Sequence, residues 1–272
     1  MSEHWRSPAR AGSWALAAAA LLAALPASGR GAPHAAAENF YELAPNAGRD
    51  AYRQIVQNHC VVNWLQHHDP SPCARIFLSD SQADSPGYAI LEHPDGGAHY
   101  LLIPTQTLSG TDGTELLDPN LPNYFAEAWR ARDLLAKFVG HEVPAVDVGL
   151  VVGTAATRTQ NQFHIHIECL RPEVAESLKS AANRLGESWS ALTVGGIPLE
   201  ARSLSLQGLE VSNPFELVAE MSEDARHRLG SYTVVLAGIQ SRSGPGFALL
   251  AGNGASGDLL LDSSCSVAGG GG

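Results

Sequence analysis

Two histidines alternate with apolar residues in one short segment of this chain, which reads Gln162-Phe-His-Ile-His-Ile-Glu-Cys169. The β-branched and aromatic residues in it favour a strand. Side chains of a strand point alternately to its two faces. The polar face therefore holds Gln162, His164, His166 and Glu168, and the core face holds Phe163, Ile165, Ile167 and Cys169. The two imidazoles are then about 6–7 Å apart along the strand.

Three uses of this polar row stay open. Histidines two residues apart on a strand are a common pair of zinc ligands, and Glu168 or a distant carboxylate could complete the set. A histidine could instead act as a nucleophile toward phosphorus, because a neutral imidazole needs no activating base. In the third interpretation both rings form ordinary hydrogen bonds at a sheet surface.

The loop before the strand favours phosphate chemistry over zinc. It is rich in hydroxyl and amide groups and contains one guanidinium, and its last four residues are Arg158, Thr159, Gln160 and Asn161. Such a loop can surround an anion with donors, and arginine can bind two phosphate oxygens at once. The loop has no carboxylate, a group that metal sites prefer nearby.

Several segments could support this strand. Residues 87–93 and 99–104 form a predicted hairpin around Pro94-Asp95-Gly96-Gly97, whose flanking His93 and His99 we expect at the surface. Further strands are predicted at 146–152, 232–239 and 247–251. Helices are predicted at 50–64, from an Asn123 cap to 138, at 172–185 and after an Asn213 cap. The pattern predicts an α+β fold, an antiparallel sheet with packed helices in a single elaborated domain at 49–266.

Composition and charge exclude several classes of protein. The chain has 17 Lys+Arg and 28 Asp+Glu, and its net charge of −11 argues against binding nucleic acid. Its 44% hydrophobic and 17% charged residues are too apolar for a disordered chain. The longest apolar run, residues 14–27, is shorter than the roughly 20 residues of a membrane-spanning helix, which excludes a polytopic membrane protein.

The termini and the cysteines indicate an exported protein. Arg6 and Arg10 precede the apolar run, and small residues follow it, so residues 1–29 are predicted to be a signal peptide or an N-terminal membrane anchor. A linker is expected at 30–48 and a flexible tail at 267–272. An even number of cysteines in an oxidising compartment predicts two disulfides. Three pairings are possible for Cys60, Cys73, Cys169 and Cys265. We favour Cys60–Cys73 with Cys169–Cys265 over a zinc site.

Longer runs of the sequence resemble a known family over most of residues 49–265. The segment 162–167 resembles the signature of the histidine-triad (HIT-like) superfamily of nucleotidyl hydrolases and transferases. One branch is closer, the bacterial CDP-diacylglycerol pyrophosphatases. The runs that carry this resemblance include Pro70-Ser-Pro-Cys73-Ala, Gly87-Tyr-Ala-Ile-Leu, Tyr100-Leu-Leu-Ile-Pro-Thr105, Ala128-Trp-Arg-Ala-Arg-Asp133, Arg158-Thr-Gln-Asn161, Phe163-His-Ile-His-Ile167 and Cys169-Leu-Arg-Pro172.

The resemblance implies an HIT-like fold and hydrolysis of CDP-diacylglycerol to CMP and phosphatidate, with water as the acceptor. His164 matches the histidine that attacks the α-phosphorus, and His166 matches the residue that binds a phosphate oxygen. Gln162 stands where the family motif has its first histidine; its amide can also donate and accept hydrogen bonds. The loop residues Arg158, Thr159, Gln160 and Asn161 match the polar part of the phosphate-binding loop.

The resemblance also implies no metal and no cofactor, and the sequence indicates neither a nucleic acid nor a protein partner. The substrate is a lipid, so we expect the protein at the periplasmic face of a bacterial inner membrane. A chain of net charge −11 can hold a pyrophosphate only where donors are concentrated, and residues 157–166 contain Arg158 and no acid. Two alternatives are a zinc-dependent envelope hydrolase using His164 and His166, and an exported binding protein without catalysis.

Overall fold

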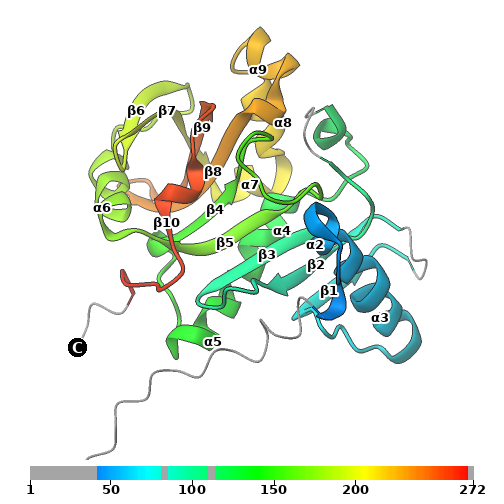
Figure 1. Ribbon diagram of the computed structural model, residues 1–272. Coiled ribbons are helices and arrows are strands. Elements are labelled where there is room, and N and C mark those ends of the chain that lie inside the picture. The colour runs from blue at the N-terminus through cyan, green and yellow to red at the C-terminus, as the bar shows by residue number, and fades with distance from the viewer. Residues whose placement is uncertain (1–41, 81–84, 110–113, 269–272) are drawn as a thin grey trace, which may run out of the picture. The chain divides into compact units, whose positions relative to one another are not determined.

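A computed structural model describes residues 42–80, 85–109 and 114–268 (Figure 1). The predicted signal or anchor at 1–29 and the first part of the predicted linker lie outside these residues. Among the residues described, no helix is both long enough and apolar enough to cross a membrane.

The strands form one antiparallel sheet in the order β1-β2-β3-β5-β4-β8-β9-β7-β6, and β10 pairs with β5. This sheet and its packed helices confirm the α+β class. The predicted hairpin is present as β2 and β3, and β5, which begins directly after His164 and carries His166, lies inside the sheet. The bounds are β1 Arg75–Leu78, β2 Gly87–Glu92, β3 His99–Pro104, β4 Val148–Val152, β5 Ile165–Leu170, β6 Ser190–Val194, β7 Ile197–Ser205, β8 Tyr232–Ser241, β9 Gly244–Asn253 and β10 Leu261–Asp262.

The predicted helices are present with local departures, and two short helices at 206–211 and 223–227 were not predicted. The first is one rod with a π-helical turn in its middle, and the Asn123-capped helix contains a 3-10 stretch before Gly140 ends it at a φ of 86°. The helix bounds are α2 Ala51–Ile55, α3 Val61–His67, α4 Tyr124–Arg130, α5 Ala136–Val139, α6 Pro172–Ala181, α7 Leu206–Val211, α8 Pro214–Ala219 and α9 Glu223–His227. Short 3-10 turns include η1 Gly48–Asp50, η4 Ala131–Leu135, η5 Ala145–Asp147 and η7 Gly257–Leu260.

The two faces of β5 have different surroundings. Ile165, Ile167 and Cys169 belong to the largest core cluster. Phe163, just before the strand, belongs to it too and packs against Phe215. On the opposite face, His166 lies between Leu101 of β3 and Val151 of β4. Leu101 is covered by α2 and α3, and Val151 belongs to the cluster under α6. The polar row of β5 therefore lies between two helix-covered regions of one sheet face.

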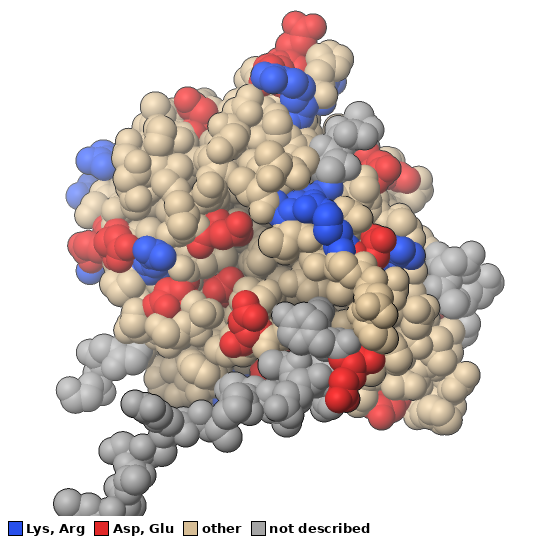
Figure 2. Space-filling model, in the orientation of Figure 1, with Lys and Arg blue, Asp and Glu red and all other residues tan. Residues whose placement is uncertain are grey.

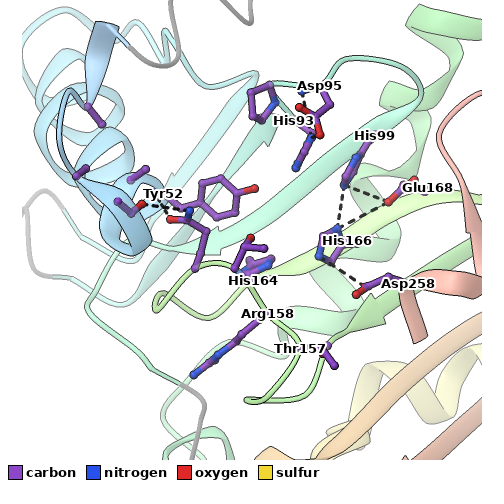
Figure 3. A pocket seen from close by; sticks show the side chains of 18 of the residues that line it. Tyr52, His93, Asp95, His99, Thr157, Arg158, His164, His166, Glu168 and Asp258 are labelled. Atoms are coloured by element: carbon purple, nitrogen blue, oxygen red, sulfur yellow. Dashed lines mark hydrogen bonds and ion pairs between the residues drawn. The ribbon is translucent and has the colours of Figure 1, made fainter. Parts of the chain in front are cut away.

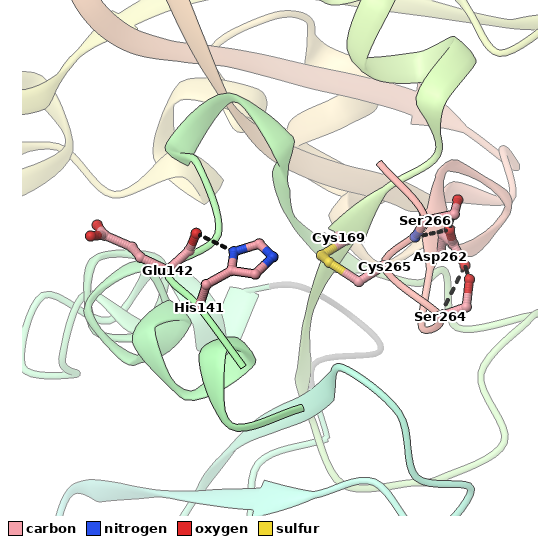
Figure 4. Close-up of a disulfide and its surroundings, with 7 residues drawn as sticks. All are labelled: His141, Glu142, Cys169, Asp262, Ser264, Cys265 and Ser266. Atoms are coloured by element: carbon pink, nitrogen blue, oxygen red, sulfur yellow. Dashed lines mark hydrogen bonds between the residues drawn. A yellow bond between two sulfur atoms is a disulfide. The ribbon is translucent and has the colours of Figure 1, made fainter. Parts of the chain in front are cut away.

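Two disulfides link these elements, in the pairing that the sequence favours. Cys60–Cys73, the N-terminal disulfide, joins the π-helical turn to the segment before β1. Cys169–Cys265, the C-terminal disulfide, joins β5 to the segment after β10 (Figure 4). That segment supports the β2–β3 turn, because Ala98 donates its backbone N–H to Ser263 O at 2.7 Å.

The boundaries predicted for the linker and the tail need correction. Ala44 is buried, and the ring of His59 hydrogen-bonds Leu43 O through Nε2 at 2.9 Å, so the described end of the linker packs on the folded part. At the other end, Val267 and Ala268 pack against the main core cluster. Apolar side chains at these positions gain more from burial than from exposure, which extends the fold at both ends.

Candidate active site

A cavity of about 720 Å³ opens over the polar row of β5. Its walls come from the start of α2, the β2–β3 turn, the loop before β5 and η7 (Figure 3). The side chains that point into it in this view include Tyr52, His93, His99, Arg158, His164, His166, Glu168 and Asp258.

His164 has one ring nitrogen committed to the backbone. Its Nδ1 lies 2.8 Å from Gln162 O. A carbonyl oxygen only accepts, so Nδ1 carries the hydrogen and Nε2 keeps the lone pair. The ring is 7% exposed and lines the cavity, where the edge of Tyr52 meets it with the ring centroids 5.1 Å apart. The result is a neutral imidazole with a fixed tautomer beside an open space.

Burial keeps this imidazole neutral. Removal from water lowers the pKa of His164 to about 3, and the nearby His166 contributes in the same direction. Burial also lowers the pKa of His166 to about 3. Both rings are therefore neutral near pH 7, and a nitrogen nucleophile must be neutral to have a free lone pair.

The ring of His166 contacts a buried pair of residues, His99 of β3 and Glu168 of β5. Its Nδ1 lies 2.9 Å from His99 Nε2, and His99 Nε2 lies 3.1 Å from Glu168 Oε1. His99 and Glu168 face each other in the β3–β5 ladder. On its other side, His166 Nε2 lies 3.9 Å from Asp258 Oδ1. The second ring is therefore held by β3 and faces the cavity through Nε2.

The carboxyl groups in this site favour their neutral forms. Burial, followed by the charges of Asp258 and Asp262, raises the pKa of Glu168 to about 8. Burial also raises the pKa of Asp258. Both shifts reflect carboxylates removed from water without a cation beside them.

The prediction that His93 and His99 lie at the surface is wrong. His99 is 8% exposed, and His93 stacks on it with ring centroids 3.9 Å apart. The β2–β3 turn does not end in solvent, because the C-terminal segment packs on it. The run His99-Tyr-Leu-Leu-Ile-Pro104 is apolar on both faces, which is typical of a strand covered on both sides. That signal could have indicated a buried His99.

Gln162 does not line the cavity. Its amide donates to Pro104 O at 3.1 Å and to Gln106 O at 2.7 Å, and accepts from Leu108 N at 3.3 Å. The side chain thus binds the backbone that follows β3. Its connection to the site is its own carbonyl, which orients His164.

The four loop residues have different positions. Arg158, Thr159 and Gln160 line the cavity, whereas Asn161 does not. The amide of Asn161 instead bonds Arg49 and Asp50, and Gln160 accepts from Tyr52 N. Arg158 donates to Ser109 O. Hydrogen bonds therefore hold this loop against the start of the first helix, and they occupy several of the groups that were expected to donate to a phosphate.

The cavity is more acidic than residues 157–166 predict. Distant segments bring Asp95 and Asp258 to its wall, Glu168 comes from β5 itself, and Arg158 is the one Lys or Arg residue among the described residues that line it. Figure 2 shows acidic side chains near the middle of this face, with a basic patch beside them. The zinc alternative also changes, because the possible ligand group found among the described residues is His99, His166 and Glu168, without His164.

Comparison with models of protein families matches residues 47–269 to CDP-diacylglycerol pyrophosphatase. The match spans well over half of the chain. The chain belongs to the CDP-diacylglycerol pyrophosphatase family. The resemblance to the CDP-diacylglycerol pyrophosphatases is therefore confirmed, and the protein is an enzyme that hydrolyses a pyrophosphate bond. Both disulfides and most of the cavity wall of this family member lie inside the matched region, including His164, His166 and Glu168.

Proposed function

We propose that His164 is the nucleophile that cleaves CDP-diacylglycerol in this enzyme. The observation that carries this assignment is the hydrogen bond from His164 Nδ1 to Gln162 O, which leaves the Nε2 lone pair toward the cavity. A neutral imidazole attacks phosphorus without a base to remove a proton first. No other histidine on the cavity wall has a ring nitrogen held by a backbone carbonyl among the bonds of the described residues.

The reaction has two displacements at the same phosphorus. Nε2 of His164 bonds to the α-phosphorus of the cytidine moiety while the bond to the bridging oxygen breaks, and phosphatidate leaves with that electron pair. Water then attacks the nucleotidyl-histidine, the phosphorus–nitrogen bond breaks, and the electron pair returns to Nε2. The products are CMP, which gains the water oxygen, and phosphatidate.

His166 stabilises the charge that develops on the phosphate oxygens. For its Nε2 to donate a hydrogen bond into the cavity, its Nδ1 must accept, and His99 Nε2 at 2.9 Å is the donor. A preorganised donor in a site with little water stabilises a transition state more than it would in bulk solvent. His99 acts here as a positioning residue, since it reaches the phosphate only through His166.

The histidine-triad superfamily is part of this proposal. Its support is an antiparallel sheet in which His166 of β5 and His164 directly before it line a cavity of about 720 Å³, on the sheet face opposite the main core. Gln162 stands where the superfamily motif has its first histidine. Its buried, hydrogen-bonded amide supports a structural role for this position. Its carbonyl supplies the contact with His164, and any residue type could offer that contact.

We assign the enzyme to the periplasmic face of a bacterial inner membrane, as an exported or anchored protein. Two disulfides support an oxidising compartment. The lipid substrate of the family supports a membrane surface. Residues 1–29, which carry the predicted signal or anchor, are outside the described part of the chain.

Trapping the intermediate tests the mechanism. The full chain is mixed with CDP-diacylglycerol labelled in the cytidine, quenched at alkaline pH within a turnover, and digested for peptide mass analysis. We expect the label on the peptide that contains His164, and none in the His164→Asn variant. His141→Asn serves as a control, because His141 is exposed and lies outside the cavity. A label on another residue, or CMP release at the normal rate by His164→Asn, contradicts the assignment.

A further inference from the structure

The cavity lacks enough positive charge for the substrate that we propose. A pyrophosphate diester carries two negative charges near neutral pH, and among the described residues of the cavity wall the one Lys or Arg side chain is that of Arg158. The guanidinium of Arg158 is partly used in a bond to Ser109 O. Negative charges are costly to hold where water is scarce unless a cation lies beside them. A bound cation would offset this cost.

Three side chains have the arrangement that a divalent cation requires. His99 Nε2, His166 Nδ1 and Glu168 Oε1 are separated by 2.9, 3.1 and 3.7 Å. Ligand atoms about 2.0–2.2 Å from a tetrahedral zinc ion are roughly 3.3 Å apart. The three atoms therefore form one face of such a tetrahedron with small adjustments. All three side chains come from the paired strands β3 and β5, which hold them rigidly.

We propose that His99, His166 and Glu168 bind Zn²⁺, and that the ion holds the pyrophosphate of the substrate. Two imidazoles and one carboxylate with an open fourth position are a ligand set of catalytic zinc sites. The open position faces the cavity, where a phosphate oxygen can enter. For the ion to bind, His99 must carry its hydrogen on Nδ1, so the ion takes the place of the hydrogen bond between His99 Nε2 and His166 Nδ1. His166 then still has its hydrogen on Nε2, and His164, which is not a ligand, keeps its Nε2 lone pair.

The surroundings fit a metal site beyond its ligands. A metal-bound imidazole usually donates its other N–H to a carboxylate, which fixes the ring. Asp258 Oδ1 lies 3.9 Å from His166 Nε2 and could accept this hydrogen, after a small shift, in the enzyme without substrate. His93 stacks on His99 with an interplanar angle of 8° and holds that ring in place. Neither residue is needed for the hydrogen bonds of His164.

Direct zinc binding tests the site without substrate. Purified full-length enzyme is dialysed against a chelator and titrated with ZnCl₂ by calorimetry, and CoCl₂ provides a visible spectrum that reports tetrahedral coordination. We expect one ion per chain, and at least a ~100-fold loss of affinity in His99→Gln and Glu168→Gln, since each removes a ligand. Asp258→Asn should lose about 10-fold, as outer partners of metal ligands do. His164→Asn and His141→Asn should bind as the wild type does.

Kinetics then test the role of the ion. We expect the zinc-free enzyme to show a KM for CDP-diacylglycerol raised about 10-fold, with a smaller change in kcat, and recovery on adding one equivalent of zinc. The role in substrate binding rests on the proposed function, whereas the site itself does not. Failure to bind one ion, or binding that His99→Gln and Glu168→Gln leave intact in folded protein, overturns the site. Stoichiometric binding without any change in KM overturns the role, and a label missing from His164 contradicts only the mechanism above.

Discussion

The burial of His164 makes a sharp prediction about activity in acid. Its pKa is lowered to about 3, because the ring is enclosed by Tyr52, the loop before β5 and His166. An ordinary imidazole with a pKa near 6.5 is only about 3% neutral at pH 5, whereas one with a pKa near 3 is about 99% neutral. Loss of the free nucleophile would therefore cost an ordinary histidine about 30-fold in rate at pH 5, and should cost His164 almost nothing.

The assay is kcat/KM for CMP release between pH 5 and 7.5, a range in which the pyrophosphate diester keeps its charge. We expect less than a two-fold fall attributable to the nucleophile. Tyr52→Ala should expose the ring edge to water, move the pKa of His164 back toward 6.5 and create an acid limb. Tyr52→Phe keeps the aromatic ring and should keep the flat profile, whatever its effect on the rate itself.

Two results would refute this reasoning. One is a wild-type profile that falls about 30-fold between pH 7.5 and 5 with an apparent pKa near 6.5, as expected of a solvated imidazole. The other is an equal acid limb in Tyr52→Ala and Tyr52→Phe, which would separate the pKa from the packing of the ring. Far-UV circular dichroism at each pH controls for unfolding.

Further predictions concern stability, measured by chemical denaturation of the full chain. In the unfolded chain His164 has its ordinary pKa of about 6.5, whereas in the folded protein its pKa is about 3. The stability that comes from keeping this ring neutral is therefore fully present above pH 6.5 and is lost as the pH falls toward about 3. The loss is about 2 kcal/mol at pH 5, and His164→Asn should lack it; an equal loss in this variant contradicts the assigned shift. Gln162→Leu leaves three backbone groups without their hydrogen-bond partner and should lower the free energy of unfolding by about 3 kcal/mol. It should also lower kcat, because the carbonyl that orients His164 shifts. Normal stability of this variant would exclude an anchoring role for Gln162. Serine replacement of the C-terminal disulfide, which spans 96 residues, should cost about 4.7 kcal/mol, against about 3 kcal/mol for the N-terminal disulfide, which spans 13; the reverse order contradicts the loop-entropy argument. Asn123→Ala should cost about 2 kcal/mol, since the side chain caps α4 and also donates to two carbonyls near α7; a loss below about 0.5 kcal/mol contradicts this.

Local patterns were sufficient for much of the sheet. The β2–β3 hairpin followed from two apolar runs around a Pro-Asp-Gly-Gly turn, and β8 and β9 from two apolar runs around a Gly/Ser/Pro turn. The strand β1 and the hairpin of β6 and β7 were not predicted. Residues 190–205 carry exposed polar and charged side chains at several positions, so their strand pattern is weak. Pairing of β7 with β9 stabilises them, which is a contact between distant parts of the chain.

The sequence predicted only those site residues that lie close together in the chain. The sequence indicated His164 and His166 because the period of a strand places neighbours i and i+2 on one face. It did not indicate His99, His93 or Asp258, which come from segments about 65 to 95 residues away in the chain. Tyr52 was missed for the same reason, since a tyrosine in an amphipathic helix is usually a core residue.

By itself, the sequence determined the family, the alternation of β5, the hairpin and the helix caps, because each depends on residues close together in the chain. The tertiary structure decided which polar groups meet. The β3–β5 register sets His99 opposite Glu168, and η7 brings Asp258 to His166. Burial between two helix-covered regions then removes water from all of them. That loss of water keeps the imidazoles neutral and raises the carboxyl pKa values, and no local pattern in the sequence encodes it.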